Sequence, residues 1–274
     1  GMSISPNNAW LAYGVDTLSR RFYEIFFKNL KTGEIIKETI PNTTGYVAWA
    51  NDNKTIFYTS KNQVTLLSEK IFRHSLRSDF KKDVLVYHEK DDSFYIGVQR
   101  SKSGEYIIIY NSSTLVSDYH ILKADNPSGK FKNFSPRGTE HEYDISHYKD
   151  KFYILTNLNA KNKRLMETNE DKTEISNWKE VIPHDDKIHL LSMRIFQNYI
   201  VINERKDGLR GLKIINQNSL KSRLINSTDV LLIHGDQDDI VSPTHLLEAK
   251  DFFLRENILS LIHISEPTRP ERIS

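Results

Sequence analysis

The sequence contains no cysteine in its 274 residues, which excludes disulfide bonds, thiolate metal ligands and a thiol nucleophile. This absence is typical of a reducing compartment, and many periplasmic proteins share it. Long hydrophobic runs are absent too, because the longest, such as 106–110 (YIIIY), are far too short to cross a bilayer. The opening GMSISPNNAW has neither the basic nor the apolar region of a signal peptide. We therefore expect a soluble cytoplasmic protein, with the periplasm as the alternative, and no membrane partner.

An excess of either charge is also lacking. The chain has 38 basic and 36 acidic residues, which gives a formal net charge of +2. The basic pairs at 20–21 and 81–82 have acidic residues around them and form no basic stripe. Such a balance gives no electrostatic basis for nucleic-acid binding, so we expect no nucleic-acid partner. The sequence leaves the oligomeric state open.

From residue 1 to about 217 the chain contains short segments rich in aromatic and β-branched residues, which predict β-strands. Turn signals such as SPNN, KTGE, NDNK and SKSG separate them, and helical periodicity is nearly absent. The fold class predicted for this range is therefore all-β. The predicted strand segments are 10–16, 21–28, 54–60, 93–99, 105–111, 151–157 and 198–204.

A unit made of a polar turn and an aromatic strand recurs along this range. Its starts, at Ser5, Ala50, Ser101, His147 and Arg194, differ by 45, 51, 46 and 47 residues. This interval is the length of one four-stranded propeller blade. A sandwich or a jelly roll is the alternative, but neither would repeat one signature at a constant interval. The sequence therefore predicts a partial β-propeller of about five blades.

Several blocks of this range closely resemble the propeller of oligopeptidase B, a trypsin-like member of the prolyl oligopeptidase family of serine peptidases. The resemblance implies a propeller that caps an α/β-hydrolase domain and restricts access to short peptides, which are cleaved after Arg or Lys. The nucleophile, the catalytic His and the acidic pockets of that family lie in the hydrolase domain, so none of them maps onto residues 1–217. The resembling blocks are 48–61, 72–110, 118–127, 141–159, 164–184 and 204–216.

The chemistry of such a peptidase is incomplete in this chain. A G-x-S-x-G elbow is required to hold a nucleophilic Ser, and no two of the 11 glycines have that spacing. A catalytic His must follow the acid, and only His245 and His263 do. His245 lies on the helix predicted directly after the acid, and His263 lies in an anomalous tail. The sequence thus lacks both the nucleophile and the catalytic His.

One member of a catalytic triad is nevertheless indicated, and it is Asp238. The segment 230–233 (VLLI) is typical of a buried parallel strand, and a polar loop follows it where open α/β sheets place their sites. Ser242 and Pro243 then predict the start of a helix over 244–256. This strand, loop and helix resemble the acid segment of α/β-hydrolases over 228–256, with Asp238 as the acid and Asp239 as a residue that orders the loop.

Other interpretations of this loop remain open. An Asp-rich turn that caps a helix is the simplest, whereas a calcium loop is disfavoured because the Gly and the distal Glu of an EF-hand are missing. The stretch 230–253 looks more like a small carboxylesterase than like oligopeptidase B. We therefore divide the chain into a partial propeller (1–217), a hydrolase fragment (218–257) and a tail (258–274). The tail, which resembles translated sequencing-adapter sequence over 259–274, is expected to lie outside the fold.

Two groups of histidines could in principle supply metal ligands. His184 with Asp185, Asp186 and His189 follows Pro183, and a solvated loop is the favoured interpretation. His141 and His147 fall on one side of a predicted strand, and the sequence supplies no further ligands near them. We expect no cofactor and no metal.

The function expected from these observations is that of a fragment of a serine-type oligopeptidase acting on short peptides, itself inactive. The alternatives are a non-catalytic propeller that serves as a binding module and a small α/β-hydrolase esterase.

Overall fold

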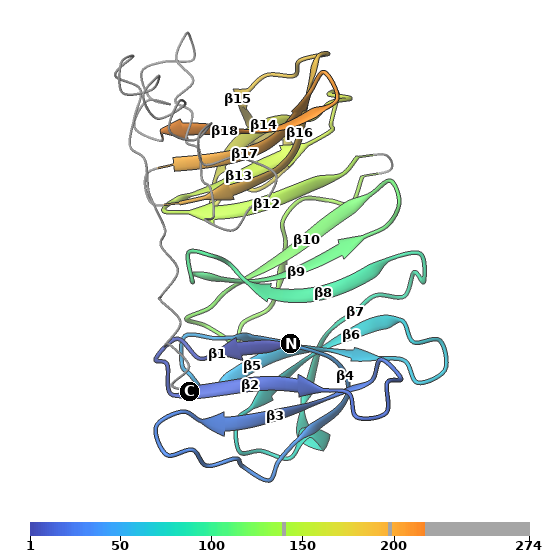
Figure 1. The fold of residues 1–274 in the computed structure, drawn as a ribbon, viewed down its shortest axis with the longest axis vertical. Helices are drawn as coiled ribbons and strands as arrows, with labels where there is room; N and C mark the ends of the chain where they lie inside the picture. The colour runs from blue at the N-terminus through green and yellow to red at the C-terminus, as the bar shows by residue number, and fades with distance from the viewer. Residues whose placement is uncertain (139–140, 197–198, 217–274) are drawn as a thin grey trace, which may run out of the picture. The chain divides into compact units, whose positions relative to one another are not determined.

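The structure is a computed structural model that describes residues 1–138, 141–196 and 199–216 (Figure 1). The described chain is built from β-strands, with two three-residue 3-10 helices at Phe80–Lys82 and Ile175–Asn177. No helix in the described part of the chain is long and apolar enough to span a membrane. The predicted all-β character is confirmed over this range.

The chain divides into two compact units, Gly1–Pro183 and His184–Ser274. The first unit contains fifteen of the described strands, in three hydrogen-bonded sheets. The described part of the second unit is one antiparallel sheet of three strands: β16 (Ile188–Ile195), β17 (Tyr199–Lys206) and β18 (Leu209–Asn216).

The first two blades share one strand. The first half of β4 pairs with β3, as at Ile25 and Ile40, and its second half pairs with β5, as at Val47 and Tyr58. The register shifts between the two halves, where Gly45 has a φ of 81°, a conformation that costs glycine little. The strand therefore closes the first blade and opens the second. The resulting seven-stranded sheet runs β1 (Met2–Ile4), β2 (Trp10–Val15), β3 (Tyr23–Asn29), β4 (Ile40–Trp49), β5 (Thr55–Lys61), β6 (Ser68–Ser75) and β7 (Val84–His88).

The third and fourth blades are separate antiparallel sheets of four strands each. The third consists of β8 (Tyr95–Arg100), β9 (Tyr106–Ser112), β10 (Ser117–Lys123) and β11 (Lys132–Asn133). The fourth consists of β12 (Tyr143–Tyr148), β13 (Lys151–Thr156), β14 (Arg164–Asn169) and β15 (Lys179–Ile182).

The sequence repeat corresponds to the turn before the second strand of each blade. The units that start at Ser5, Ala50, Ser101, His147 and Arg194 lead into β2, β5, β9, β13 and β17. In the first four of these turns one residue adopts a positive φ, and these residues are Asn8, Asn53, Gly104 and Lys149. The recurring polar signature therefore reflects one turn geometry that the first four blades share. The predicted partial propeller is confirmed.

Side-chain alternation along the strands builds a core between neighbouring blades. In β9, Ile107 and Ile109 face the second blade, while Tyr106 and Ile108 face the fourth. Because successive side chains of a strand point to opposite faces, a central blade needs apolar residues at nearly every position. The continuous apolar run of β9, which is too short for a membrane span, is thus the middle of a stack of sheets.

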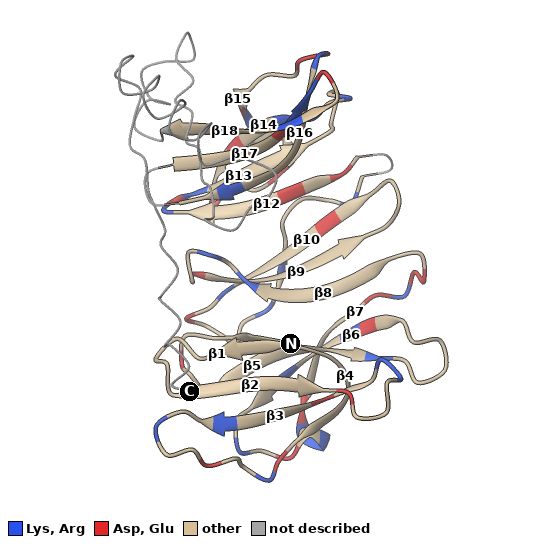
Figure 2. Ribbon diagram, in the orientation of Figure 1, with Lys and Arg blue, Asp and Glu red and all other residues tan. Residues whose placement is uncertain are grey.

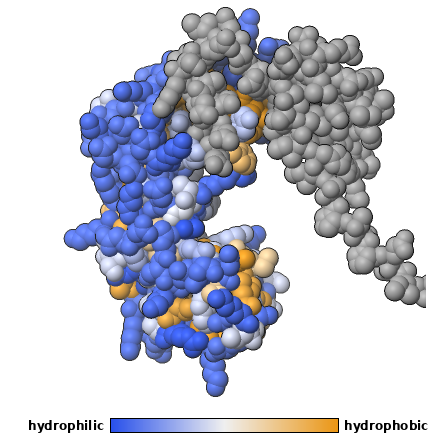
Figure 3. Space-filling view, turned by 90° about the vertical axis from the view of Figure 1, so that its left-hand side faces the viewer, coloured by the Kyte–Doolittle hydropathy of each residue, from blue (hydrophilic) through white to orange (hydrophobic). Residues whose placement is uncertain are grey.

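Charged side chains of both signs are interspersed over the loops, and the strands carry few of them (Figure 2). The face seen in Figure 3 is mostly hydrophilic where the chain is described, with hydrophobic side chains grouped in its lower part.

Candidate functional site

The predicted acid, Asp238, lies outside the described residues, as do Asp239 and the predicted helix over 244–256. Its catalytic role therefore stays a prediction. The chemistry available in the described residues is found in the first unit, in a polar cavity and in a cluster around His147.

The polar cavity has a volume of about 640 Å³ and lies along the inner strands of the first three blades. Its wall combines hydroxyl and amide groups with two cations, Lys61 and Arg100. A second cavity of about 420 Å³ shares Gln99 and Tyr110 with the first and adds two acids, Glu142 and Asp144. The other polar residues of the first cavity are Ser3, Thr44, Tyr46, Thr59, Ser68, Gln99 and Tyr110.

Tyr110 reaches this cavity because the residue opposite it is a glycine. Gly97 on β8 pairs with Tyr110 on β9, and a Cβ at Gly97 would lie 2.2 Å from the Tyr110 hydroxyl oxygen. Any side chain at this position would displace the phenol ring. Burial raises the pKa of Tyr110, so its hydroxyl is protonated at neutral pH and can both donate and accept hydrogen bonds.

The second cavity contains a carboxylate that is held in place from the neighbouring blade. The Tyr119 hydroxyl donates to Asp144 Oδ1 at 2.8 Å, and burial raises the pKa of Tyr119 well above its usual value. Hydroxyl, amide and carboxylate groups of this kind match the donors and acceptors of a peptide backbone. The described wall offers such groups, but it holds no nucleophile paired with a general base.

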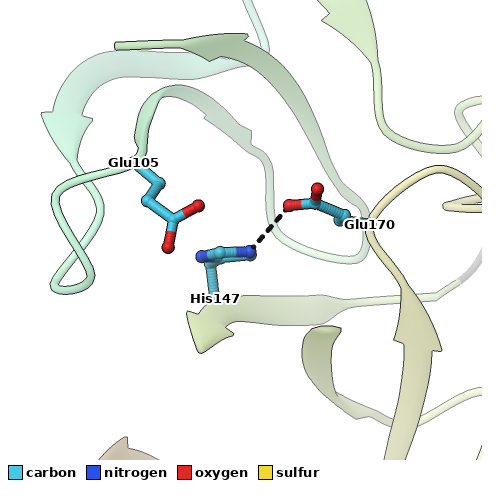
Figure 4. Close-up of side chains that lie close together, drawn as sticks. All are labelled: Glu105, His147 and Glu170. Atoms are coloured by element: carbon cyan, nitrogen blue, oxygen red, sulfur yellow. Dashed lines mark hydrogen bonds and ion pairs between the residues drawn. The ribbon is translucent and has the colours of Figure 1, made fainter. Parts of the chain in front are cut away.

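The cluster around His147 joins the third and fourth blades (Figure 4). Glu105 comes from the turn between β8 and β9, His147 from β12, and Glu170 from the turn after β14. One ligand atom from each lies within 4.8 Å of the other two. His147 Nε2 lies 3.2 Å from Glu170 Oε2, and the His147 side chain is fully buried.

Hydrogen bonds organise the rest of this cluster. Glu170 Oε2 accepts from Lys123 Nζ and from the Tyr106 hydroxyl, each at 2.8 Å. The hydrogen bond from Lys123 is the main cause that lowers the pKa of Glu170. Ser103 Oγ lies 2.9 Å from His147 Nδ1 and so fixes the other side of the ring. The sequence indicated no further ligands near His147, whereas the structure brings two carboxylates to it; the expected absence of a metal stays a prediction.

The other histidines in the described part of the chain are not grouped in this way. His184 Nε2 lies 3.8 Å from Asp186 Oδ1, and the Asp186 side chain is 94% exposed. His141 is buried and stacks on Tyr143, with the two ring centroids 5.4 Å apart. Among residues 1–138, 141–196 and 199–216, three metal-ligating side chains come together only at Glu105, His147 and Glu170.

The sequence and the fold of the chain were compared with those of known proteins, and both comparisons point to one family. The model of the prolyl oligopeptidase N-terminal beta-propeller domain matches residues 1–240. The chain belongs to the prolyl oligopeptidase family. The match covers the predicted propeller and extends beyond residue 217. The resemblance inferred from the sequence blocks is therefore confirmed.

Two curated relatives illustrate the similarity. The chain is 37% identical over 213 residues to dipeptidyl aminopeptidase BI of Pseudoxanthomonas mexicana, a match that covers 77% of this chain and 29% of that protein. It is 30% identical over 220 residues to protease 2 of Moraxella lacunata, with coverage of 80% and 31%. The chain thus spans about 30% of the length of these relatives.

Solved structures show the same fold. Oligopeptidase B from Leishmania major superposes with a TM-score of 0.74 at 23% identity, covering 79% of this chain and 30% of that one. Oligopeptidase B from Trypanosoma brucei, in a closed form with covalently bound antipain, superposes with a TM-score of 0.71 at 26% identity and the same coverage. The described strands therefore form the propeller fold of this family.

Proposed function

We propose that the chain is the propeller of a longer serine oligopeptidase that cleaves short peptides after Arg or Lys. The observation that carries this proposal is the family match over residues 1–240. The specificity for Arg or Lys rests on the resemblance to oligopeptidase B, and cytoplasm or periplasm is the proposed location. In this proposal the propeller selects short peptides, and its polar inner wall contacts them on the way to catalytic residues elsewhere in the protein.

The test uses the longer protein and fluorogenic peptides that end in Arg, Lys or Phe, each with a free and with a blocked N-terminus. We expect cleavage after Arg and Lys whether or not the N-terminus is blocked. One relative is named a dipeptidyl aminopeptidase. If the enzyme cleaves only peptides whose free N-terminus lies two residues before the cleaved bond, the proposed specificity would be replaced by that of a dipeptidyl aminopeptidase.

The selection of short peptides has a test of its own. Tyr110→Ala in the longer protein removes the phenol that lies in the walls of both cavities. We expect kcat/KM for a long unstructured polypeptide to rise relative to that for a tripeptide. Lys179→Ala, an exposed residue of the outer strand β15, serves as the control. An unchanged ratio in Tyr110→Ala would remove this wall from the proposed selection.

A binding module is the second candidate, because the cavity is present in the first unit without any catalytic residue. Calorimetric titration of this chain with Arg-containing tripeptides distinguishes the two. Tight binding by the chain, together with a lack of cleavage by the longer protein, would favour the module. The esterase alternative rests on residues 231–239 alone, which lie outside the described part of the chain.

A further inference from the structure

We propose that Glu105, His147 and Glu170 form a binding site for a divalent transition metal of the Zn²⁺ class, with the Lys123 ammonium group in the metal's place until one binds. One imidazole nitrogen and two carboxylate oxygens are a donor set that Zn²⁺ accepts in proteins. In the described residues this is the one place where three such groups converge.

The His147 ring is already oriented as a ligand. Its side chain is fully buried, and its centroid lies 4.7 Å from that of Tyr106 and 4.8 Å from that of Phe152. Ser103 Oγ holds Nδ1 at 2.9 Å, and Nε2 faces the Glu170 carboxylate, with Glu105 on the other side of the ring (Figure 4). Histidine ligands of metals are commonly fixed in this way, by a hydrogen bond to the nitrogen that does not bind.

The spacing of the ligand atoms fits after a small movement. Ligand atoms at about 2.0–2.2 Å from a tetrahedral Zn²⁺ lie about 3.5 Å from one another. His147 Nε2 and Glu170 Oε2 are 3.2 Å apart, which is close to this value. Glu105 lies on a turn with its side chain 45% exposed, so rotation about its side-chain bonds can close the remaining gap.

A cation already occupies the position between the carboxylates. Lys123 Nζ lies 2.8 Å from Glu170 Oε2, 3.8 Å from Glu105 Oε2 and 4.2 Å from the centre of the Tyr106 ring. The Lys123 side chain is 45% exposed, so it can swing into solvent when a metal enters. An ion pair with this much exposure contributes little to stability, and its loss opposes metal binding only weakly.

A metal at this place would join two blades. Glu105 belongs to the third blade, and His147 and Glu170 belong to the fourth. Because the blades must be packed together for the three ligands to meet, metal binding favours the folded state and raises the unfolding temperature with metal concentration.

The experiment titrates the whole chain, freed of metal with a chelator, with Zn²⁺ in a calorimeter and records the unfolding temperature in parallel. We expect one Zn²⁺ per chain and a rise in unfolding temperature. His147→Gln should abolish both, and Lys123→Gln should tighten binding about fivefold because the competing ion pair is gone. His184→Gln, which removes a histidine of the loop before β16, is the matched control and should bind as the unchanged chain does.

Two outcomes would overturn the proposal. One is the absence of 1:1 binding in both the unchanged chain and Lys123→Gln. The other is binding that persists in His147→Gln and disappears in His184→Gln, which would show adventitious binding by a surface histidine. If His147→Gln fails to fold, Glu105→Gln replaces it, because Glu105 is partly exposed and its loss leaves the core intact. The visible absorption of Co²⁺ in place of Zn²⁺ then reports the coordination geometry for each folded variant.

Discussion

Single residues with a positive φ set the turn that repeats from blade to blade. At Gly104 φ is 78°, and a Cβ there would lie 2.7 Å from Arg100 Nη2. Arg100 Nη2 donates to the Gly104 carbonyl oxygen at 3.0 Å and also to Asn51, so a displaced guanidinium would lose contacts with two blades. The conformation of one turn residue thus influences the packing of the blade beside it.

We predict that Gly104→Ala lowers the free energy of unfolding by about 1–2 kcal/mol, because alanine in the left-handed region is strained. Gly211→Ala is the control, since no atom lies within 4 Å of its added Cβ and its φ is not in that region. Urea unfolding of both variants measures the difference. An equal free energy of unfolding for the two variants would show that the turn at residue 104 accommodates alanine without strain.

Buried histidines make the stability depend on pH. Burial lowers the pKa of His120 and of His141 below the usual 6.5. Asp118 and Glu89 also face His120 and raise its pKa, whereas Arg137 lowers it, and burial is the largest cause of the net lowering. A histidine with a lowered folded pKa binds fewer protons than it does in the unfolded chain, so stability is present above pH 6.5 and falls as the pH drops below that value.

We therefore predict that the urea midpoint falls between pH 7 and pH 5, and that His141→Gln reduces this fall. His88→Gln should leave the pH dependence unchanged, because His88 is exposed. A urea midpoint that stays constant over this pH range, or that rises on acidification, would show that the buried histidines do not control the pH dependence of stability.

Joints between neighbouring blades depend on a few buried polar groups. Arg137 Nε donates to Asp118 Oδ2 and Arg137 Nη2 donates to Glu89, while its guanidinium lies 3.9 Å from the centre of the Phe94 ring. The Asp118 side chain is 1% exposed, so its charge depends on these partners. Asn111 Nδ2 also donates to Asp118, which leaves Arg137 as the cation that neutralises it.

At this joint we predict that Arg137→Met costs about 3 kcal/mol, because it leaves a buried carboxylate without its cation. The control is Arg77→Met, whose ion pair with Glu34 has side chains 57% and 50% exposed and should contribute less than about 1 kcal/mol. Thermal unfolding of the two variants gives the comparison. A similar loss in both would mean that Asp118 finds another partner.

The elements were predictable to the extent that they carry local signals. The aromatic strands and the turns before them recur at a nearly constant interval, which indicated the blades. Strand β4 was not predicted, because its Pro41 and Gly45 normally interrupt strands and only the shared pairing with two blades explains it. The His147 cluster was missed for a related reason, since Glu170 lies 23 residues from His147 in the sequence and Glu105 reaches it only when the third and fourth blades pack together.

For the whole molecule, the missing nucleophile determines the expected activity. No G-x-S-x-G spacing occurs in the chain, and the cavity wall holds no nucleophile with a base beside it. An acid such as Asp238 can only orient a catalytic His and stabilise its charge.

We predict that the purified chain cleaves neither a fluorogenic peptide that ends in Arg nor a short-chain ester. Loss of a complete triad in a serine protease costs about a millionfold in kcat. Turnover that survives Asp238→Ala would indicate a contaminating enzyme. Turnover that this substitution abolishes would contradict the prediction and show that an unidentified nucleophile is present.

The shared strand β4 has a mechanical consequence. Backbone hydrogen bonds run without interruption from β1 to β7, whereas the sheets that begin at β8 and at β12 pair with no strand of the preceding sheet. Separating the first two blades therefore requires bending the continuous strand β4 and breaking the pairing of Thr43 with one of its two neighbouring strands, while separating the second from the third exposes mainly side chains. Under a pulling force, or during slow amide exchange, residues 2–88 should open as one unit, and the first unit should part between sheets, after β7 or after β11.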